Sequence, residues 1–146
     1  MSKLRITKEF GFEMAHMLDG YNGRCSNLHG HSYRLFVTVE GELCANGAAH
    51  DNGMVMDFAL LKNIVNEEVI DKFDHSVTLW RESPQCEAIA KTTERINLVG
   101  YRPTSENLVC DFAERIAKRL PAGVRLYSIK LYETATSCVE WINDED

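Results

Sequence analysis

Three histidines in the first part of the chain have a spacing that could hold a metal ion. His29 and His31 are separated by one residue, so on an extended chain both imidazoles project from the same side. His16 ends an earlier alternating segment and has the same parity as the apolar residues of that segment. Catalytic zinc is bound by three protein ligands, with a fourth position left for water or substrate. The pattern therefore predicts a zinc site, with hydrogen-bonded structural histidines as the alternative.

Two further features could move protons. Cys25 lies four residues before His29, in a stretch rich in glycine, asparagine and serine. A thiol near a metal ion or an imidazole ionises more readily and can act as a base or a nucleophile. The pair Asp74 and His75 is the second feature, because a carboxylate can orient an imidazole for proton transfer. An inert cysteine and an ordinary surface Asp-His pair are the alternatives.

Carboxylate and hydroxyl groups later in the chain are candidates for ligand binding. Glu133 has the parity of the apolar residues of its segment, and a carboxylate there can bind two N–H groups of a heterocycle. An internal ion pair is an equally supported alternative. Thr104, Ser105 and Glu106 begin a predicted helix, whose exposed N–H groups could receive a ligand. A helix cap with an acid in the first turn explains the same three residues.

The elements that must position these residues follow from the apolar periodicity. Alternation predicts strands over 4–17, 31–41, 124–133 and 137–142, with a further short strand over 95–99. Asp57 is expected to cap a helix that ends near residue 71, and a second helix runs from Pro103-Thr104 to residue 120. Residues 72–92 read as irregular. This order predicts one α+β domain over 1–146, with an antiparallel sheet and helices on one face.

Composition restricts the class of protein. Of 146 residues, 45% are hydrophobic and 26% are charged, which excludes a disordered or fibrous chain. No apolar run approaches the roughly 18 residues of a membrane span. The net charge of −6, without a basic cluster, argues against nucleic-acid or membrane-surface binding. The chain start lacks a signal-peptide pattern and the five cysteines form no Cys-x-x-Cys pair, so we expect reduced thiols and a cytoplasmic location.

Taken together, these motifs resemble the 6-pyruvoyltetrahydropterin synthase / 6-carboxytetrahydropterin synthase family. The motifs that occur in the family's order are Phe12-x-x-x-His16, Cys25-x3-His29-Gly30-His31, Asp74-His75, Pro103-Thr104-x-Glu106-Asn107 and Glu133-Thr134. The resemblance implies the tunnelling fold and trimeric barrels that stack as hexamers, with active sites at subunit contacts. Exposed sheet edges also predict a homo-oligomer. The three residues between Cys25 and His29 resemble the bacterial carboxy synthases of the 7-deazaguanine (queuosine) route, whereas animal pyruvoyl enzymes have a longer gap.

The resemblance also implies a role for each candidate residue. The residues that would bind Zn²⁺ are His16, His29 and His31. The residues that would carry protons are Cys25 and, from the same or a neighbouring subunit, Asp74 and His75. The residues that would hold the pterin ring are Glu133, as its anchor, and Thr104, Ser105 and Glu106, which would line its pocket.

The reaction implied by the resemblance starts from 7,8-dihydroneopterin triphosphate. It yields 6-carboxy-5,6,7,8-tetrahydropterin and releases triphosphate and acetaldehyde. A pyruvoyl-type synthase, which only eliminates triphosphate, is the first alternative. A non-catalytic oligomer that binds pterins or purines is the second, although binding alone would need neither Cys25 nor the Asp74–His75 pair.

Overall fold

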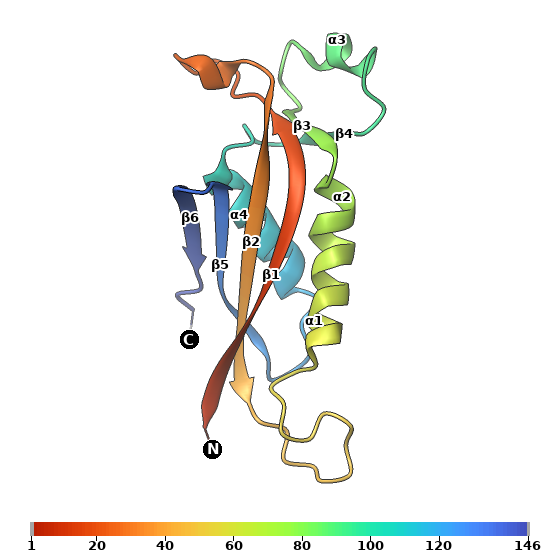
Figure 1. Cartoon of the computed structure of the whole chain (residues 1–146), viewed down its shortest axis with the longest axis vertical. Coiled ribbons are helices and arrows are strands. Elements are labelled where there is room, and N and C mark those ends of the chain that lie inside the picture. The colour runs from red at the N-terminus through yellow and green to blue at the C-terminus, as the bar shows by residue number, and fades with distance from the viewer. Residues whose placement is uncertain (1, 146) are drawn as a thin grey trace.

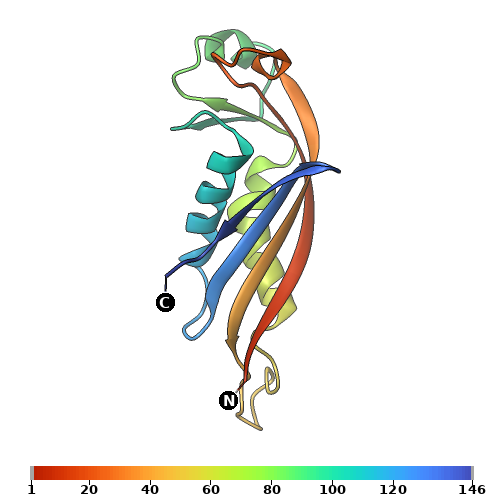
Figure 2. The same ribbon diagram turned by 90° about the vertical axis from the view of Figure 1, so that its left-hand side faces the viewer.

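The computed structural model describes residues 2–145, which form a long, twisted sheet with its main helices on one face (Figures 1 and 2). The strands are β1 (Lys3–His16), β2 (His29–Glu42), β3 (Ser76–Trp80), β4 (Ile96–Val99), β5 (Arg125–Thr134) and β6 (Ser137–Ile142). Their order in the sheet is β4-β3-β1-β2-β5-β6. The α+β class is confirmed, and each predicted strand is found within two residues of its expected ends.

The helical elements are η1 (Arg24–Ser26), α1 (Phe58–Val65), η2 (Asn66–Ile70), α2 (Asp71–Phe73), α3 (Cys86–Ala90) and α4 (Ser105–Ala117). The segments α1, η2 and α2 follow one another without a break, and η2 is a π-helical turn. Asp57 caps α1, as predicted, by accepting a hydrogen bond of 2.9 Å from the N–H of Ala59. Thr104 caps α4 in the same way, through the N–H of Asn107 at 3.1 Å.

The core lies between the sheet and the helices. Phe12 of β1 stacks on Tyr33 of β2, with ring centroids 4.9 Å apart, and meets Phe112 of α4 edge to face at 6.0 Å. Leu108 and Ile116 continue the buried stripe of α4. Burying each such side chain contributes about 1.5–3 kcal/mol. These contacts hold α4 across the two strands that carry the histidines.

Two expectations about the sheet are corrected. Residues 72–92, predicted as irregular, contain β3 and α3. The sheet is mixed, because β3 pairs in parallel with both β1 and β4, while β1, β2, β5 and β6 pair antiparallel as expected. The buried side of β3 carries polar residues, so β3 lacks the apolar alternation by which a strand is predicted. The Ser76 hydroxyl donates to the carbonyl of Phe73 at 2.7 Å, and the Thr78 hydroxyl donates to the sulfur of Met14 at 3.2 Å.

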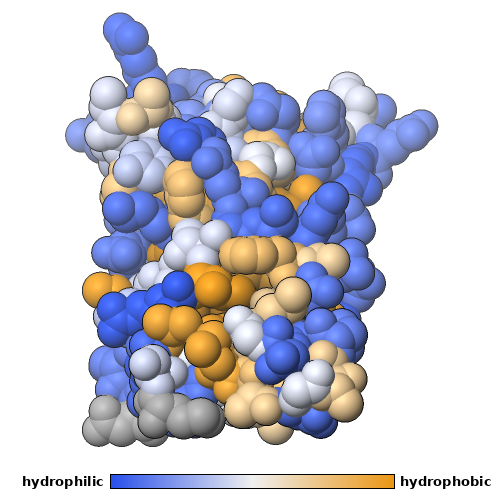
Figure 3. All heavy atoms as spheres, turned by 60° about the horizontal axis from the view of Figure 1, so that its bottom comes forward, coloured by the Kyte–Doolittle hydropathy of each residue, from blue (hydrophilic) through white to orange (hydrophobic). Residues whose placement is uncertain are grey.

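One end of the molecule carries exposed apolar side chains (Figure 3). The start of β1, the loop 43–57 and the first turn of α1 meet at this end (Figure 1). The large apolar residues of these segments that are more than one third exposed are Leu4, Leu43, Met54, Phe58 and Leu60. We call this the lower apolar surface. Among residues 2–145, no helix combines the length and apolar character needed to cross a membrane.

Candidate active site and metal centre

The hairpin of β1 and β2 brings the three histidines together. His16 ends β1 and His29 begins β2, and the two residues are direct partners in the antiparallel register. His31 lies two residues further along β2 and therefore shares the side of His29. His16 is completely buried, whereas His29 and His31 are partly exposed. Strand register therefore places the three histidines at one end of the hairpin.

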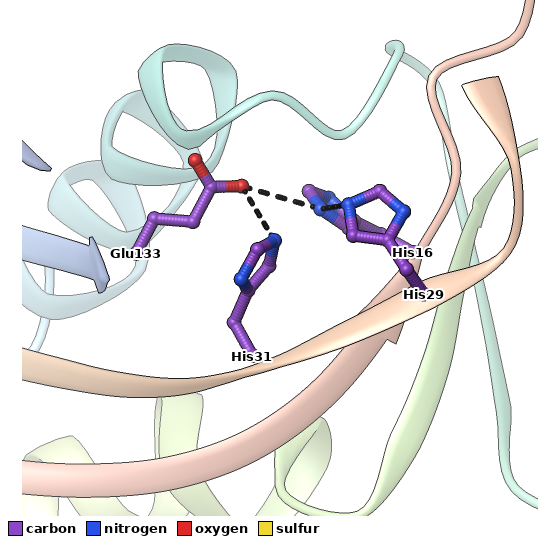
Figure 4. A group of neighbouring side chains, drawn as sticks. All are labelled: His16, His29, His31 and Glu133. Atoms are coloured by element: carbon purple, nitrogen blue, oxygen red, sulfur yellow. Dashed lines mark hydrogen bonds and ion pairs between the residues drawn. The ribbon is translucent and has the colours of Figure 1, made fainter. Parts of the chain in front are cut away.

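The three imidazoles and the carboxylate of Glu133, near the end of β5, converge on one point (Figure 4). The Nε2 of His16 is 3.1 Å from the Nε2 of His29 and 3.3 Å from the Oε1 of Glu133. The same Oε1 is 3.1 Å from the Nε2 of His31. Donors around a tetrahedral zinc ion at 2.0–2.1 Å are separated by about 3.3 Å. The observed spacing therefore fits a small tetrahedral ion, and this group could hold a metal.

Backbone carbonyls orient two of the rings. The Nδ1 of His16 donates to the carbonyl of Pro103 at 2.7 Å, and the Nδ1 of His29 donates to the carbonyl of Asn27 at 2.6 Å. Because a carbonyl only accepts, both Nδ1 atoms carry hydrogen, so in the neutral rings two Nε2 lone pairs face each other. The Nε2 of His31 is buried and has no hydrogen-bond partner. A shared cation satisfies all three nitrogens, and carbonyl-oriented imidazoles are typical of metal sites.

The electrostatics of the cluster favour metal binding. Contact with His16 is the main cause that lowers the pKa of the Glu133 carboxyl, so this group stays ionised. Desolvation by burial lowers the pKa of His31, which favours its neutral, metal-binding form. Burial also raises the pKa of the Tyr33 phenol, with a further contribution from the negative charge of Glu133. Neutral imidazoles with a carboxylate are a donor set suited to divalent transition metals, including zinc.

Cys25 does not join this cluster. It lies in η1, within the loop that connects the two histidine-bearing strands, and it is exposed. Its sulfur is not among the donor atoms that lie within 4.8 Å of one another. The loop is closed by a hydrogen bond of 2.9 Å from the N–H of Leu18 to the carbonyl of Cys25. The thiol is therefore held in a defined loop, free of the metal donors.

Asp74 and His75 attach to the edge of β1 at Glu13. The Oδ1 of Asp74 accepts from the N–H of Glu13 at 2.9 Å and lies 3.0 Å from the Nδ1 of His75. The N–H of His75 donates to the carbonyl of Glu13 at 2.6 Å. The bond from the Glu13 backbone is the main cause that lowers the pKa of Asp74. The predicted carboxylate–imidazole pair is thus present, with an ionised carboxylate.

This pair is not part of the group of four converging donors. The imidazole of His75 is 74% exposed, and it lines an open pocket together with Glu13, His31 and Ser32. Among residues 2–145, His75 is the only non-glycine residue with a positive φ, at 59°. Such a conformation is strained by about 1–3 kcal/mol and is frequent at functional sites.

Of the three residues predicted at the start of α4, only Ser105 is buried beside the cluster. Its hydroxyl is near the Glu133 carboxylate and contributes to the lowered pKa of that group. The hydroxyl is buried and lacks a well-formed hydrogen bond. The hydroxyl of Thr104 is used in capping the helix, and Glu106 is exposed.

Glu133, a predicted site residue, forms the internal ion pairs that we gave as its alternative, and its Oε1 is a fourth possible donor beside the histidines. Sequence reasoning missed the backbone carbonyls and Tyr33. The roles of the Asn27 and Pro103 carbonyls could not be predicted from residue type, because every residue has a backbone carbonyl. Tyr33 was not among the predicted site residues, although a buried phenol two residues from His31 needs a partner.

Comparison with known proteins identifies the family. A sequence model of the 6-pyruvoyl tetrahydropterin synthase family matches residues 5–143. A Haemophilus influenzae protein named 6-carboxy-5,6,7,8-tetrahydropterin synthase is 41% identical over 143 residues, which cover 94% of this chain and 97% of the relative. A Synechocystis protein of the same name is 35% identical over 142 residues, with 94% and 92% covered.

A solved structure has the same fold. The 6-pyruvoyl tetrahydropterin synthase of Caenorhabditis elegans aligns with a TM-score of 0.69 and 24% identity, over 99% of this chain and 98% of that one. The fold, the order of the motifs and the sequence matches agree, and the chain belongs to the 6-pyruvoyl tetrahydropterin synthase family.

Proposed function

We propose that this chain is a zinc-dependent 6-carboxy-5,6,7,8-tetrahydropterin synthase. It converts 7,8-dihydroneopterin triphosphate to the 6-carboxy product with release of triphosphate and acetaldehyde, as a cytoplasmic step of 7-deazaguanine (queuosine) biosynthesis. The observation that carries the proposal is the convergence of His16, His29, His31 and Glu133 on one point. The names of the bacterial relatives support the carboxy product over the pyruvoyl one.

The chain's own residues divide the work between metal binding and ring binding. His16, His29 and His31 hold the ion through Nε2. When bound, zinc supplies a Lewis acid that polarises the hydroxyl groups of the substrate side chain. Glu133, which is ionised, accepts the 2-amino and N3 hydrogens of the pterin ring. Binding the ring requires this carboxylate to give up its contacts with His16 and His31.

Cys25 and the Asp74–His75 pair are the proposed proton carriers. The thiol is exposed in the loop that joins the two histidine-bearing strands. Asp74 contacts the Nδ1 of His75, which leaves the Nε2 free to exchange protons. The pair that serves each site comes from the same copy or from a neighbouring copy.

The proposed assembly is a homo-oligomer, a trimer or a hexamer, with active sites at the contacts between copies. Within the described chain, β4 and β6 are the edges of the sheet, and unpaired edges favour pairing with another strand. The lower apolar surface is a second region that another copy could cover. Light scattering at micromolar concentration should give a multiple of 16.6 kDa, and the mass of a single chain would refute the assembly.

Product analysis tests the proposed reaction. The zinc-loaded protein is incubated with 7,8-dihydroneopterin triphosphate, and we expect a 6-carboxypterin species together with acetaldehyde by mass spectrometry. A 6-pyruvoyl species would assign the activity for which the family is named. Absence of turnover would overturn the proposal and leave a pterin-binding protein. His29→Ala should abolish turnover, whereas His50→Ala, which changes a histidine outside the cluster, should not.

A further inference from the structure

One buried polar group near the metal donors has no role in the scheme above: the phenol of Tyr33. Tyr33 is only 1% exposed, and its hydroxyl has no hydrogen-bond partner. An unpaired buried hydroxyl destabilises a protein by about 1–3 kcal/mol, and phenylalanine would avoid that loss with the same shape. A tyrosine at this position therefore indicates a partner that is present in another state of the site.

Tyr33 packs against the two rings that contact Glu133. Its ring lies edge to face with His31 at 5.6 Å and with His16 at 6.2 Å between centroids. Those same imidazoles contact the Oε1 of Glu133 at 3.1 Å and 3.3 Å. Phe12 stacks on the phenol at 4.9 Å, with 6° between the ring planes. The phenol is thus fixed between the core and the donor cluster.

In the proposed function, the Glu133 carboxylate exchanges its contacts with the histidines for contacts with the pterin ring. Its present contacts are with two proposed metal ligands, and a pterin ring would compete with both. Ser105 supplies a second buried hydroxyl without a hydrogen bond, and it lies beside the same carboxylate. The buried hydroxyls of Tyr33 and Ser105 are donors that a second position of this carboxylate would use.

We propose that Tyr33 is a positioning residue for Glu133: its hydroxyl donates a hydrogen bond to the carboxylate when a pterin ring draws that carboxylate away from His16 and His31. This inference rests on the proposed function, because the pterin ring is the ligand that causes the change. The phenol keeps its proton and acts only as a donor, so the carboxylate keeps acceptor sites for the ring N–H groups.

Tyr33→Phe in the zinc-loaded full chain tests the proposal, with neopterin, a pterin that lacks the triphosphate, as the probe. We expect the dissociation constant to rise about tenfold, as for a lost hydrogen bond to a charged group. Zinc content should stay at the wild-type level and the unfolding midpoint should not fall. A purely structural tyrosine would give the opposite pattern, with a lower midpoint and unchanged affinity.

Tyr132→Phe is the matched control. Tyr132 is adjacent to Glu133 in sequence, but its ring packs against Phe36 at 5.8 Å, on residues whose parity is opposite to the buried side of their strands. This variant also removes one phenolic hydroxyl, but from the side of the sheet away from the cluster. It should therefore leave the affinity for neopterin unchanged. An equal loss in both variants would overturn the assignment to Tyr33.

A double-mutant cycle with Glu133→Ala shows whether the phenol acts through the carboxylate. In the Glu133→Ala background, Tyr33→Phe should change the neopterin affinity, or kcat/KM where binding is weak, by less than about twofold. A tenfold effect in that background, or no effect in the wild-type background, would overturn the inference alone. Failure of the wild-type protein to bind neopterin would overturn the proposed function and this inference with it.

Discussion

Removal of the metal should lower the thermal stability of this protein by a predictable amount. Without a cation, the Nε2 atoms of His16 and His29 face each other at 3.1 Å, and the buried Nε2 of His31 forms no hydrogen bond, although it lies 3.1 Å from the Oε1 of Glu133. An ion that binds only the folded state stabilises it by about 2.7 kcal/mol when its free concentration is one hundred times the dissociation constant. For a domain of this length, that corresponds to a midpoint higher by roughly 10 °C.

The assay compares unfolding of the zinc-loaded protein with and without a strong chelator. We expect the wild-type midpoint to fall by roughly 10 °C on chelation. His29→Ala should lose most of this difference, because it removes one of the four converging donors. His50→Ala should keep it, because His50 is exposed in the loop 43–57 and is not one of those donors. A wild-type midpoint that does not respond to chelation would refute the reasoning from facing lone pairs.

Three further predictions follow from the contacts described. Glu40 accepts hydrogen bonds from two arginines at 2.8 and 3.2 Å, and the bond from Arg5 is the main cause that lowers its pKa. The ionised carboxylate therefore stabilises the fold fully above about pH 4.5, and this contribution is lost as the pH falls through the lowered folded-state pKa. In denaturant titrations from pH 6 to pH 3, the free energy of unfolding should fall less steeply in Glu40→Gln than in the wild type. Cys25→Ala and His75→Ala should each abolish turnover. If the two residues meet across a subunit contact, an equal mixture of the two variants reassembled as trimers should recover roughly a quarter of the wild-type turnover. No recovery would mean that both residues of a site come from the same subunit. Phe112→Ala should destabilise the fold by about 3–5 kcal/mol in urea unfolding, because Phe112 is fully buried among aromatic rings, and a loss below about 1 kcal/mol would contradict this packing.

The metal cluster could be predicted because side-chain direction in a strand depends only on a period of two. His16 and His31 have the same parity as the buried residues of their strands. Their side of the sheet can therefore be predicted even when the predicted strand ends are wrong by a residue or two. The pairing of His16 with His29 is a property of the β1–β2 register, which neither strand contains alone. Glu133 reaches the cluster through the pairing of β2 with β5, so its contacts with the histidines needed the assembled sheet.

The part of the fold that could not be predicted depends on long-range pairing. β3 has Ser76 and Thr78 on its buried side, where periodicity arguments expect apolar residues. Both hydroxyls find partners only in the folded chain, and the strand itself is held by pairing with β1, more than fifty residues earlier. A hydrophobic pattern cannot report a strand whose stability comes from such partners.

Because His16 and His29 are directly opposed, the chain leaves the β1–β2 ladder and returns to it at the same level. The ladder sets the place of both residues in the sheet, whereas the loop 17–28 carries Cys25 and the Asn27 carbonyl that orients the His29 ring. A slip of β2 by one residue would turn His29 and His31 to the other side of the sheet, so an ion bound by the three histidines would also secure the correct alignment of the hairpin. The hairpin is thus a fixed frame for the donors, and a redesigned loop should keep the Asn27 carbonyl and Cys25 if metal binding and turnover are to be retained.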